Sequence, residues 1–485
     1  MAFVVRTFFI ASLNTEYLGI NGLFHNVLTM LSFAELGIGT AIIFSMYKPV
    51  DEQNIPRLKS LMKLYKKCYT IIGLVVFGLG LCVIPFMGII VKDVPNIKEN
   101  IIVIYLLFLF NTSSSYFFTY KKSIISAHQQ QIVINRMDSV FYLLKSICEI
   151  IFLVLTKNYI VYLLIQIGGT FIENIVIARK ANKMFPYITE KDAEDLPKEE
   201  QKTIFDNVRS LVIYKAGTTV MNGTDNILIS SLIGTAVVGL CSNYTMIIDA
   251  IRGVIASAYK GITASVGNLN AQSDVEKKEK VFYELTFITY WLYSFCAIAF
   301  VALANPFVLL WTRKEAYVMG IEIPIALAFS FYLNGIREPA YTYRVTFGFF
   351  EEGRLAPFIA TIVNIISSII LCKVFGTVGI YIGTSVTQLL SYSWIDPYVI
   401  HKYGFRSKSS KYFKKYALYT LIFTANLALT YLAVSLIPLK GIPGFIVKGV
   451  VAAIVPNVVY LIVFHKTDEF QAFKKRILRV FHKKV

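Results

Sequence analysis

The stretch YLGI at residues 17–20 decides how this chain is interpreted, because a related stretch, VVGL, returns at residues 237–240. Each copy stands at the start of a long apolar segment. A second echo has a similar offset. NTSSSYFFTYK at 111–121 returns as NGIREPAYTYR at 334–344, with Asn, Thr, Tyr and a basic residue at the same spacing. Duplicated halves that bury charge in lipid are typical of transporters whose substrate path runs between the halves.

The composition predicts a membrane protein. The mean hydropathy is +0.60, 56% of the residues are apolar and only 16% are charged, whereas soluble proteins carry about 25% charged residues. The net charge of +18 does not indicate a nucleic-acid partner, because the basic residues cluster in short loops beside apolar segments. The six cysteines are scattered and lie apart from any histidine cluster, so we expect no metal site.

The apolar runs predict about fourteen membrane segments, most of them long enough to cross the hydrocarbon core. They lie at residues 2–13, 22–47, 70–91, 101–120, 140–155, 159–178, 211–233, 244–266, 282–311, 323–347, 355–374, 379–399, 416–437 and 445–464. The fold class is therefore an all-α polytopic membrane protein, with two six-helix lobes around a central cavity and two further C-terminal helices. The first segment is too short to span a bilayer, so we expect the true start of the chain to lie upstream of Met1.

The polar stretches predict the domain boundaries. We expect an N-terminal six-helix lobe at 1–180, a cytoplasmic inter-lobe linker at 181–209, a C-terminal six-helix lobe at 210–400, two additional helices at 401–464 and a basic cytoplasmic tail at 465–485. Most of the 48 basic residues fall in alternate loops, which predicts that both termini are cytoplasmic. In the tail, Phe470 and Phe473 share one face of a basic helix, which suits a helix on an anionic leaflet.

Charged and polar side chains inside the segments share helical faces, at spacings of three, four, seven or eleven residues. A charge near the bilayer centre costs several kcal/mol unless it faces protein or water, so these stripes predict one water-filled cavity. The predicted substrate-binding residues are Arg6, Lys215, Asn222, Arg252, Lys260 and Arg337. The predicted ion-coupling or cavity acids are Glu35, Asp225 and Asp249.

Cations in a wet cavity suit a phosphate-bearing substrate, because Arg and Lys form charge-assisted hydrogen bonds to phosphate oxygens. The acids are candidates for binding a coupling H⁺ or Na⁺. Two pairs have a structural interpretation as well: Asp249 with Arg252, and Lys145 with Glu149, for which a structural ion pair is favoured. The sequence holds no P-loop, no H-E-x-x-H and no G-x-S-x-G motif, so we expect a transporter without an ATPase site rather than an enzyme.

The N-terminal part of the chain resembles a known signature. EYLGINGLF at 16–24, LSFAELGIGTA at 31–41 and YKP at 47–49 are similar to the opening of bacterial polysaccharide repeat-unit (Wzx-like) flippases, members of the multidrug/oligosaccharidyl-lipid/polysaccharide exporter superfamily. The second half carries matching stretches, TDNILIS at 224–230, VGLCSNY at 238–244 and ASVGNL at 264–269. The resemblance covers most of the chain and is specific for the family, but not for the substrate.

The resemblance implies a cavity lined by helices one, two, seven and eight. It also implies transport of undecaprenyl-pyrophosphate-linked oligosaccharide from the inner to the outer leaflet of the bacterial plasma membrane. The polysaccharide would be an O-antigen, a capsule or a related polymer, and the partners would be the bilayer, the lipid-linked oligosaccharide, and the polymerase and glycosyltransferases of the same pathway. Two alternatives stay open: a drug or metabolite exporter of the same superfamily, and a membrane-embedded glycan polymerase or glycosyltransferase.

Overall fold

The computed structural model describes residues 1–35, 38–92, 96–190, 192–270, 274–349 and 356–482. Side chains are described at all of these positions except 33–34, 40–41, 203, 207–222, 260–261, 264, 268, 270 and 476–482. Every regular element within these ranges is helical. The chain divides into two compact units, Met1–Gly239 and Leu240–Val485.

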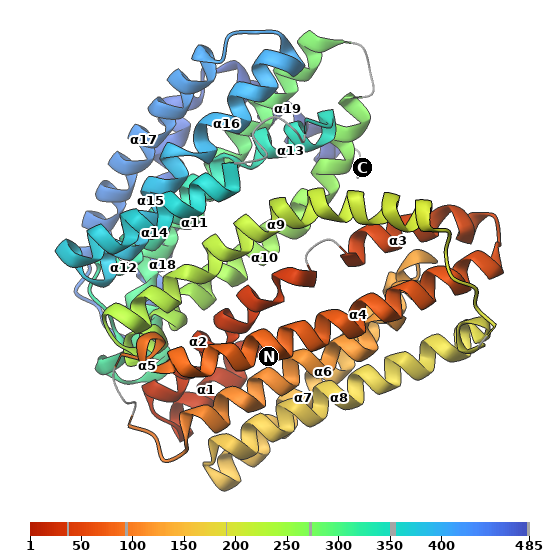
Figure 1. The fold of residues 1–485 in the computed structure, drawn as a ribbon. Coiled ribbons are helices and arrows are strands. Elements are labelled where there is room, and N and C mark those ends of the chain that lie inside the picture. Colours follow the sequence, from red (N-terminus) through yellow and green to blue (C-terminus); the bar gives the residue numbers. More distant parts are fainter. Residues whose placement is uncertain (36–37, 93–95, 191, 271–273, 350–355, 483–485) are drawn as a thin grey trace. The chain divides into compact units, whose positions relative to one another are not determined.

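Unit 1 consists of nine helices and the start of a tenth, within the described ranges. They are α1 (Ala2–Ser12), α2 (Thr15–Leu31), α3 (Ile38–Asp51), α4 (Ile55–Val83), α5 (Met87–Ile90), α6 (Ile101–Ala127), α7 (Gln131–Thr156), α8 (Tyr159–Met184), α9 (Lys198–Leu232) and the first turn of α10 (Thr235–Asn270). Figure 1 shows α4, α6, α7 and α8 running side by side, and contacts join α4 to α6, α6 to α8 and α7 to α8.

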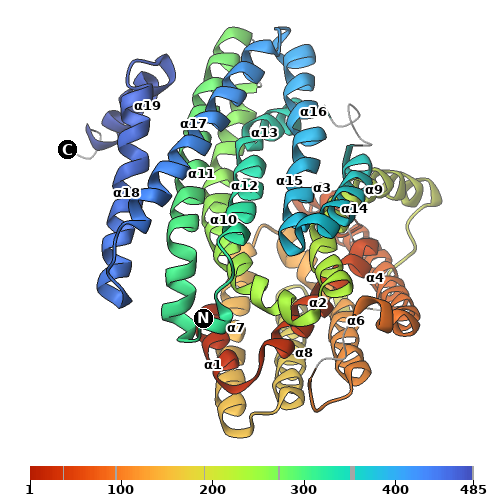
Figure 2. The ribbon, with the colours of Figure 1, turned by 90° about the vertical axis from the view of Figure 1, so that its left-hand side faces the viewer.

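Unit 2 contains the rest of α10 and nine more described helices. They are α11 (Val275–Thr312), α12 (Glu322–Ile336), α13 (Glu338–Phe347), α14 (Ala356–Phe375), α15 (Thr377–Leu390), α16 (Tyr392–Val399), α17 (Ser410–Ser435), α18 (Gly441–Phe464) and α19 (Asp468–His482). Helix α11 packs against α12, α17 and α18, as Figure 2 shows.

The predicted fold class is confirmed. Each of the predicted segments coincides with one helix or with two consecutive helices, and nine stretches of the described chain are long and apolar enough to cross a membrane. Four predicted segments are interrupted within the described residues, and the one at 70–91 breaks at the 3₁₀ helix Ile84–Phe86, between α4 and α5. The segment at 22–47 breaks at a 3₁₀ turn, Ser32–Glu35, the one at 323–347 breaks before Pro339, and the one at 379–399 breaks at Ser391. Pro339 lacks the N–H that a continuous helix needs, and it fits the first turn of α13.

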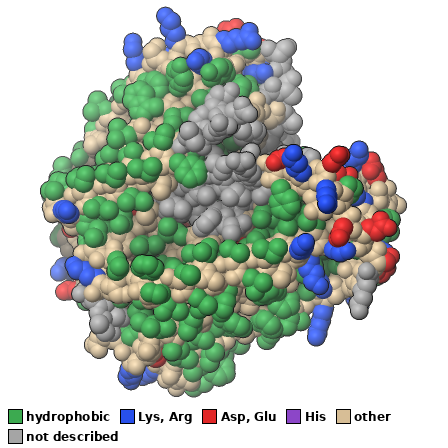
Figure 3. Space-filling model, viewed as in Figure 1, with side chains coloured by type: hydrophobic (Ala, Val, Ile, Leu, Met, Phe, Trp, Pro, Cys, Tyr) green, Lys and Arg blue, Asp and Glu red, His purple; other side chains and the backbone are tan. Residues whose placement is uncertain are grey.

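Acidic side chains of the segment between α8 and α9 form ion pairs with lysines in the first turns of α4. Lys59 pairs with Glu190 and, at 2.9 Å, with Asp192. Lys63 pairs with Asp195 at 3.0 Å. The hydrogen bond from Lys59 lowers the pKa of the Asp192 carboxyl. Figure 3 shows charged side chains of both signs gathered at one end of unit 1, whereas apolar side chains cover the length of its helices. The predicted domain boundary at 181–209 stays a prediction, and α9 itself packs against α2 and α3 of unit 1.

Aromatic side chains fill unit 2 where α11 meets the C-terminal helices. The rings of Tyr290 and Tyr419 stack with centroids 4.3 Å apart. Phe470 of α19 stacks on Trp291, with centroids 5.8 Å apart, and Phe473 also contacts Trp291. The predicted tail helix therefore forms, and its two described phenylalanines pack on α11 rather than pointing toward a membrane surface.

Candidate functional site: charged side chains within the membrane helices

Glu35 lies at the break between α2 and α3, in the 3₁₀ turn that interrupts the second predicted segment. The hydroxyl of Tyr69 donates a hydrogen bond of 3.0 Å to Oε1 of Glu35, and the Tyr65 hydroxyl lies 3.3 Å from that of Tyr69. Both tyrosines are buried in α4. The carboxylate of Glu35 is thus held at a broken helix by a buried hydroxyl chain, and broken membrane helices commonly form ion and substrate sites.

The other predicted residues of unit 1 lie on α1 and α9. Arg6 is half-buried on α1 and interacts electrostatically with Tyr159 and Tyr162 of α8. Asp225 is half-buried on α9. Lys215 and Asn222 also belong to α9, but their side chains lie outside the described part of the chain. The grouping of Arg6, Glu35 and Asp225 in one cavity stays a prediction.

Asp249 and Arg252 form an ion pair on α10. Nη1 of Arg252 lies 3.1 Å from Oδ1 of Asp249. The side chains are 48% exposed for Arg252 and 64% exposed for Asp249. The pair sits near the middle of a helix of 36 residues. The side chain of Lys260, two turns further on, lies outside the described residues. An exposed pair leaves the outer donors of the guanidinium open to a ligand.

Arg337 joins a buried cluster in unit 2 instead of an open surface. Nε of Arg337 lies 2.5 Å from Oδ2 of Asp396, and Nη1 of Arg344 lies 2.6 Å from Oδ1 of the same carboxylate. The Asp396 side chain is fully buried. The guanidinium of Arg337 also stacks over the ring of Tyr392 at 4.1 Å. One carboxylate bridging two arginines at the α12–α13 break favours a structural role for Arg337.

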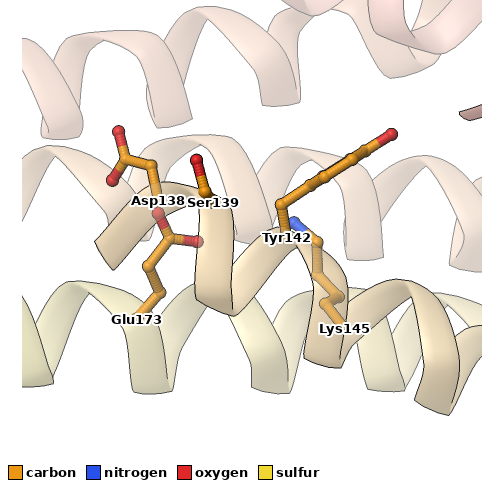
Figure 4. Close-up of a pocket in the computed structure, with 5 residues that line it drawn as sticks. All are labelled: Asp138, Ser139, Tyr142, Lys145 and Glu173. Atoms are coloured by element: carbon orange, nitrogen blue, oxygen red, sulfur yellow. The ribbon is translucent and has the colours of Figure 1, made fainter. Parts of the chain in front are cut away.

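A further charged pocket in unit 1 was not predicted from the sequence. It has a volume of about 410 Å³ and is lined by Asp138, Ser139, Tyr142, Lys145 and Glu173. Figure 4 shows four of these side chains on α7, with Glu173 reaching toward Asp138 from the neighbouring helix α8. Lys122 of α6 lies 2.9 Å from Asp138 and 3.7 Å from Glu173.

Lys145 and Glu149 do not form the ion pair that their spacing suggested. Neither side chain takes part in any ion pair of the described chain. Oε1 of Glu149, a residue only 4% exposed, has no hydrogen-bond partner in the structure. The polar face at 138, 142, 145 and 149 has spacings of four, three and four residues, and this pattern could have revealed the pocket. Within the described residues, no cluster of His, Cys, Asp and Glu could hold a metal ion.

Comparison with known proteins places the fold. No protein-family model matches the sequence, and no curated protein matches it. The lipid II flippase MurJ, in an inward closed conformation, is similar in structure with a TM-score of 0.62 and 15% identity, and the match covers 96% of each chain. An inward-facing multidrug resistance transporter of the MATE family, in the MOP superfamily, has a TM-score of 0.61 and 15% identity over 80% of this chain and 92% of the other. A MOP superfamily transporter from Pyrococcus furiosus has a TM-score of 0.53 and 14% identity over 82% of this chain and 91% of the other.

Proposed function

We propose that this chain, which has the fold of the MOP transporter superfamily, is a flippase for lipid-linked oligosaccharides. It moves undecaprenyl-pyrophosphate-linked repeat units from the inner to the outer leaflet of the bacterial plasma membrane, for the synthesis of a surface polysaccharide. Both termini lie in the cytoplasm. The chain uses alternating access, coupled to H⁺ or Na⁺, and it acts with the polymerase and glycosyltransferases of the same pathway.

The exposed ion pair in the middle of α10 carries this proposal. Lipid contact at that position would cost about 2.5–3.5 kcal/mol for each charge, so Asp249 and Arg252 face water or a polar cargo. Arginine offers a planar fork of donors that binds two phosphate oxygens at once. The pyrophosphate of the proposed cargo supplies such oxygens. The sugars linked to it supply hydroxyls that can donate hydrogen bonds to the carboxylate of Asp249.

The extent of the likeness also favours a lipid-linked cargo over a drug. The match to MurJ covers 96% of this chain, whereas the matches to the MATE transporter and to the Pyrococcus furiosus transporter cover 80% and 82%. Helices α17 and α18 together make up 50 residues. A match over 96% of this chain must include part of them, whereas a match over 80% or 82% can leave both out. MurJ is named as a lipid II flippase, so an architecture matched over 96% of both chains supports a lipid-linked cargo.

The predicted side chains divide the work of such a cycle. Arg252, with Lys215, Lys260 and Arg6, supplies positive charge for the pyrophosphate. Glu35, Asp225 and Asp249 are the acids that would exchange the coupling ion. Glu35 is suited to this because its carboxyl accepts a hydrogen bond from the buried Tyr69 hydroxyl, so that binding of a proton or Na⁺ would change the hydrogen bonds at the α2–α3 break.

Deletion of the gene tests the proposal in the cells that carry it. We expect the lipid-linked oligosaccharide to accumulate with its sugars on the cytoplasmic face, and surface polysaccharide to disappear. Plasmid-borne expression of the chain should restore both. Normal surface polysaccharide in the deletion strain, with increased sensitivity to cationic drugs, would instead identify a drug exporter. Accumulation of single repeat units on the outer face would identify a polymerase.

A further inference from the structure

The charged pocket of α6, α7 and α8 contains one cation, Lys145, that makes no close ion pair within the described chain, although Glu149 and Glu173 interact with it at longer range. Lys122 is neutralised by Asp138 and Glu173, at 2.9 and 3.7 Å. Lys145, by contrast, makes no ion pair and no hydrogen bond within the described chain, although it lines the same pocket. An ammonium group among membrane helices that makes no close ion pair and no hydrogen bond is costly, so it faces water or an anionic ligand.

Lys145 lies inside the predicted membrane segment at 140–155, near the middle of α7. It stands fourteen residues after Gln131 in a helix of 26 residues, about 21 Å along α7 at 1.5 Å per residue. Its aliphatic stem lies across Gly169 of α8, since a Cβ added at Gly169 would be 2.9 Å from Cδ and 3.0 Å from Cγ of Lys145. The glycine therefore lets the lysine cross α8 and directs its stem along the pocket wall.

The remaining lining has the chemistry of a sugar site. The carboxyl oxygens of Asp138 and Glu173 can accept hydrogen bonds, as sugar hydroxyls require, and Lys122 lies within 4 Å of both groups. Tyr142, 44% exposed, offers a ring face beside them. The volume of about 410 Å³ falls in the range of small-molecule sites, about 300–1,000 Å³. An apolar drug would leave these four charges desolvated, and two lysines disfavour a metal cation.

We propose that this pocket binds a sugar ring that carries an acidic substituent, a carboxylate or a phosphate. Lys145 pairs with the acidic group, and Asp138 and Glu173 accept hydrogen bonds from ring hydroxyls. The proposal rests on the proposed function, because it makes the ring part of the lipid-linked oligosaccharide. It adds a specificity site for acidic repeat units, built in unit 1 from residues other than those assigned to the pyrophosphate.

Binding of soluble sugars to the purified full-length chain in detergent tests the site. Saturation-transfer NMR with methyl glucuronide, glucose phosphate, methyl glucoside, inorganic phosphate and phosphoethanolamine provides the comparison. We expect methyl glucuronide or glucose phosphate to bind at least tenfold more tightly than methyl glucoside. Lys145→Met should weaken that binding roughly tenfold or more, as loss of a charge-assisted contact does. Lys180→Met, which removes an exposed lysine of α8, should leave binding unchanged.

Two more variants keep the test decisive if Lys145→Met does not fold. Lys145→Arg preserves the charge and should retain binding of the acidic sugar. Glu173→Gln should weaken binding of the sugars but not the preference for an acidic group. Equal binding of glucoside and glucuronide would overturn the proposal. Inorganic phosphate or phosphoethanolamine binding as tightly as the sugars would overturn it as well, because the pocket would then be an anion or lipid head-group site.

The experiments distinguish a failure of the proposed sugar pocket from a failure of the proposed flippase function. Flipping of a lipid-linked oligosaccharide by a chain that binds no acidic sugar would refute the pocket and leave the function intact. Binding of methyl glucuronide that depends on Lys145, in a chain that moves no lipid-linked oligosaccharide, would refute the function and leave a sugar site whose cargo is different.

Discussion

Gly19 and Gly239 pack reciprocally within unit 1, each against the first turn of the other's helix. A Cβ added to Gly19 would collide with the backbone carbonyl of Thr235, and one added to Gly239 would collide with that of Thr15 and lie 2.9 Å from the nitrogen of Gly19. Thr15 and Thr235 are the first residues of α2 and α10. The two glycines occupy the same place in the repeated stretches at 17–20 and 237–240, so the repeat in the sequence is also a contact in the structure.

This contact predicts that any side chain at either glycine is destabilising. Gly19→Ala and Gly239→Ala should each lower stability by about 1–3 kcal/mol or more, because backbone atoms have to move. The thermal midpoint in detergent should fall for both. Gly78→Ala is the matched control, since nothing lies within 4 Å of its added Cβ, and alanine favours a helix by about 1 kcal/mol. An unchanged midpoint for both variants would show that α2 and α10 do not approach so closely.

The exposed pair on α10 predicts separate effects on export and abundance. Arg252→Ala, like Lys215→Ala, should abolish surface polysaccharide while leaving normal amounts of protein in the membrane. Losing one phosphate contact costs about 1.5–3 kcal/mol, or roughly ten- to a hundredfold in affinity. Arg252→Lys should restore export only in part, because a point charge replaces a fork. Export assays and membrane immunoblots measure the two effects.

The double variant Asp249→Asn with Arg252→Gln distinguishes a binding residue from a structural one. If the pair is structural, each single change strands a charge, and the neutral double variant recovers both folding and export. Full export by the double variant would therefore remove Arg252 from the substrate site.

The cluster around Asp396 predicts the opposite behaviour. Asp396→Asn leaves Arg337 and Arg344 without their shared carboxylate in a fully buried place, and removal of one partner of such a cluster costs about 3–5 kcal/mol. The amount of folded protein, measured by size-exclusion chromatography, should fall sharply. Asp249→Asn, at an exposed pair, should keep its normal amount. Normal folding of Asp396→Asn with lost transport would instead assign this cluster to the substrate path.

The distribution of basic loops predicts the topology. Cysteines placed at Glu194 and Lys408 should react with a membrane-impermeant maleimide only from the cytoplasmic side, and a cysteine at Lys314 only from outside. The native cysteines are replaced beforehand, and permeabilised cells show that each site can react. Labelling at Lys408 in intact cells would overturn the predicted orientation.

The sequence predicted the helices well and the side-chain partners poorly. Apolar length marks a membrane segment locally, and the break before α13 lies beside Pro339, a residue that interrupts a continuous helix. Glu35, at the break between α2 and α3, accepts a hydrogen bond from Tyr69 of another helix, and no local pattern predicts that partner. The same holds for Arg337, whose partner Asp396 is 59 residues away. Asp249 and Arg252 were predictable because three residues bring them together on one helix.

The pocket of Lys145 shows why helix spacing alone misleads. Four residues separate Lys145 from Glu149, which allows an ion pair, yet the stem of Lys145 lies over Gly169 of α8 instead. The acids of the pocket come from two helices, and Lys122 comes from a third. Packing of α7 on α8 decides which of these groups meet, and that packing is not encoded in the spacing of charges along one segment.

Reconstitution into liposomes tests the central claim most directly. The purified chain is placed in vesicles that contain a fluorescent undecaprenyl-pyrophosphate oligosaccharide, and a membrane-impermeant quencher reports which leaflet holds the sugars. We predict that an ion gradient makes the inner pool accessible within minutes, that no nucleotide is needed, and that Arg252→Ala vesicles stay protected like protein-free ones. An inner pool that stays protected with the wild-type chain, in vesicles where the same protein exports a cationic dye, would contradict the account.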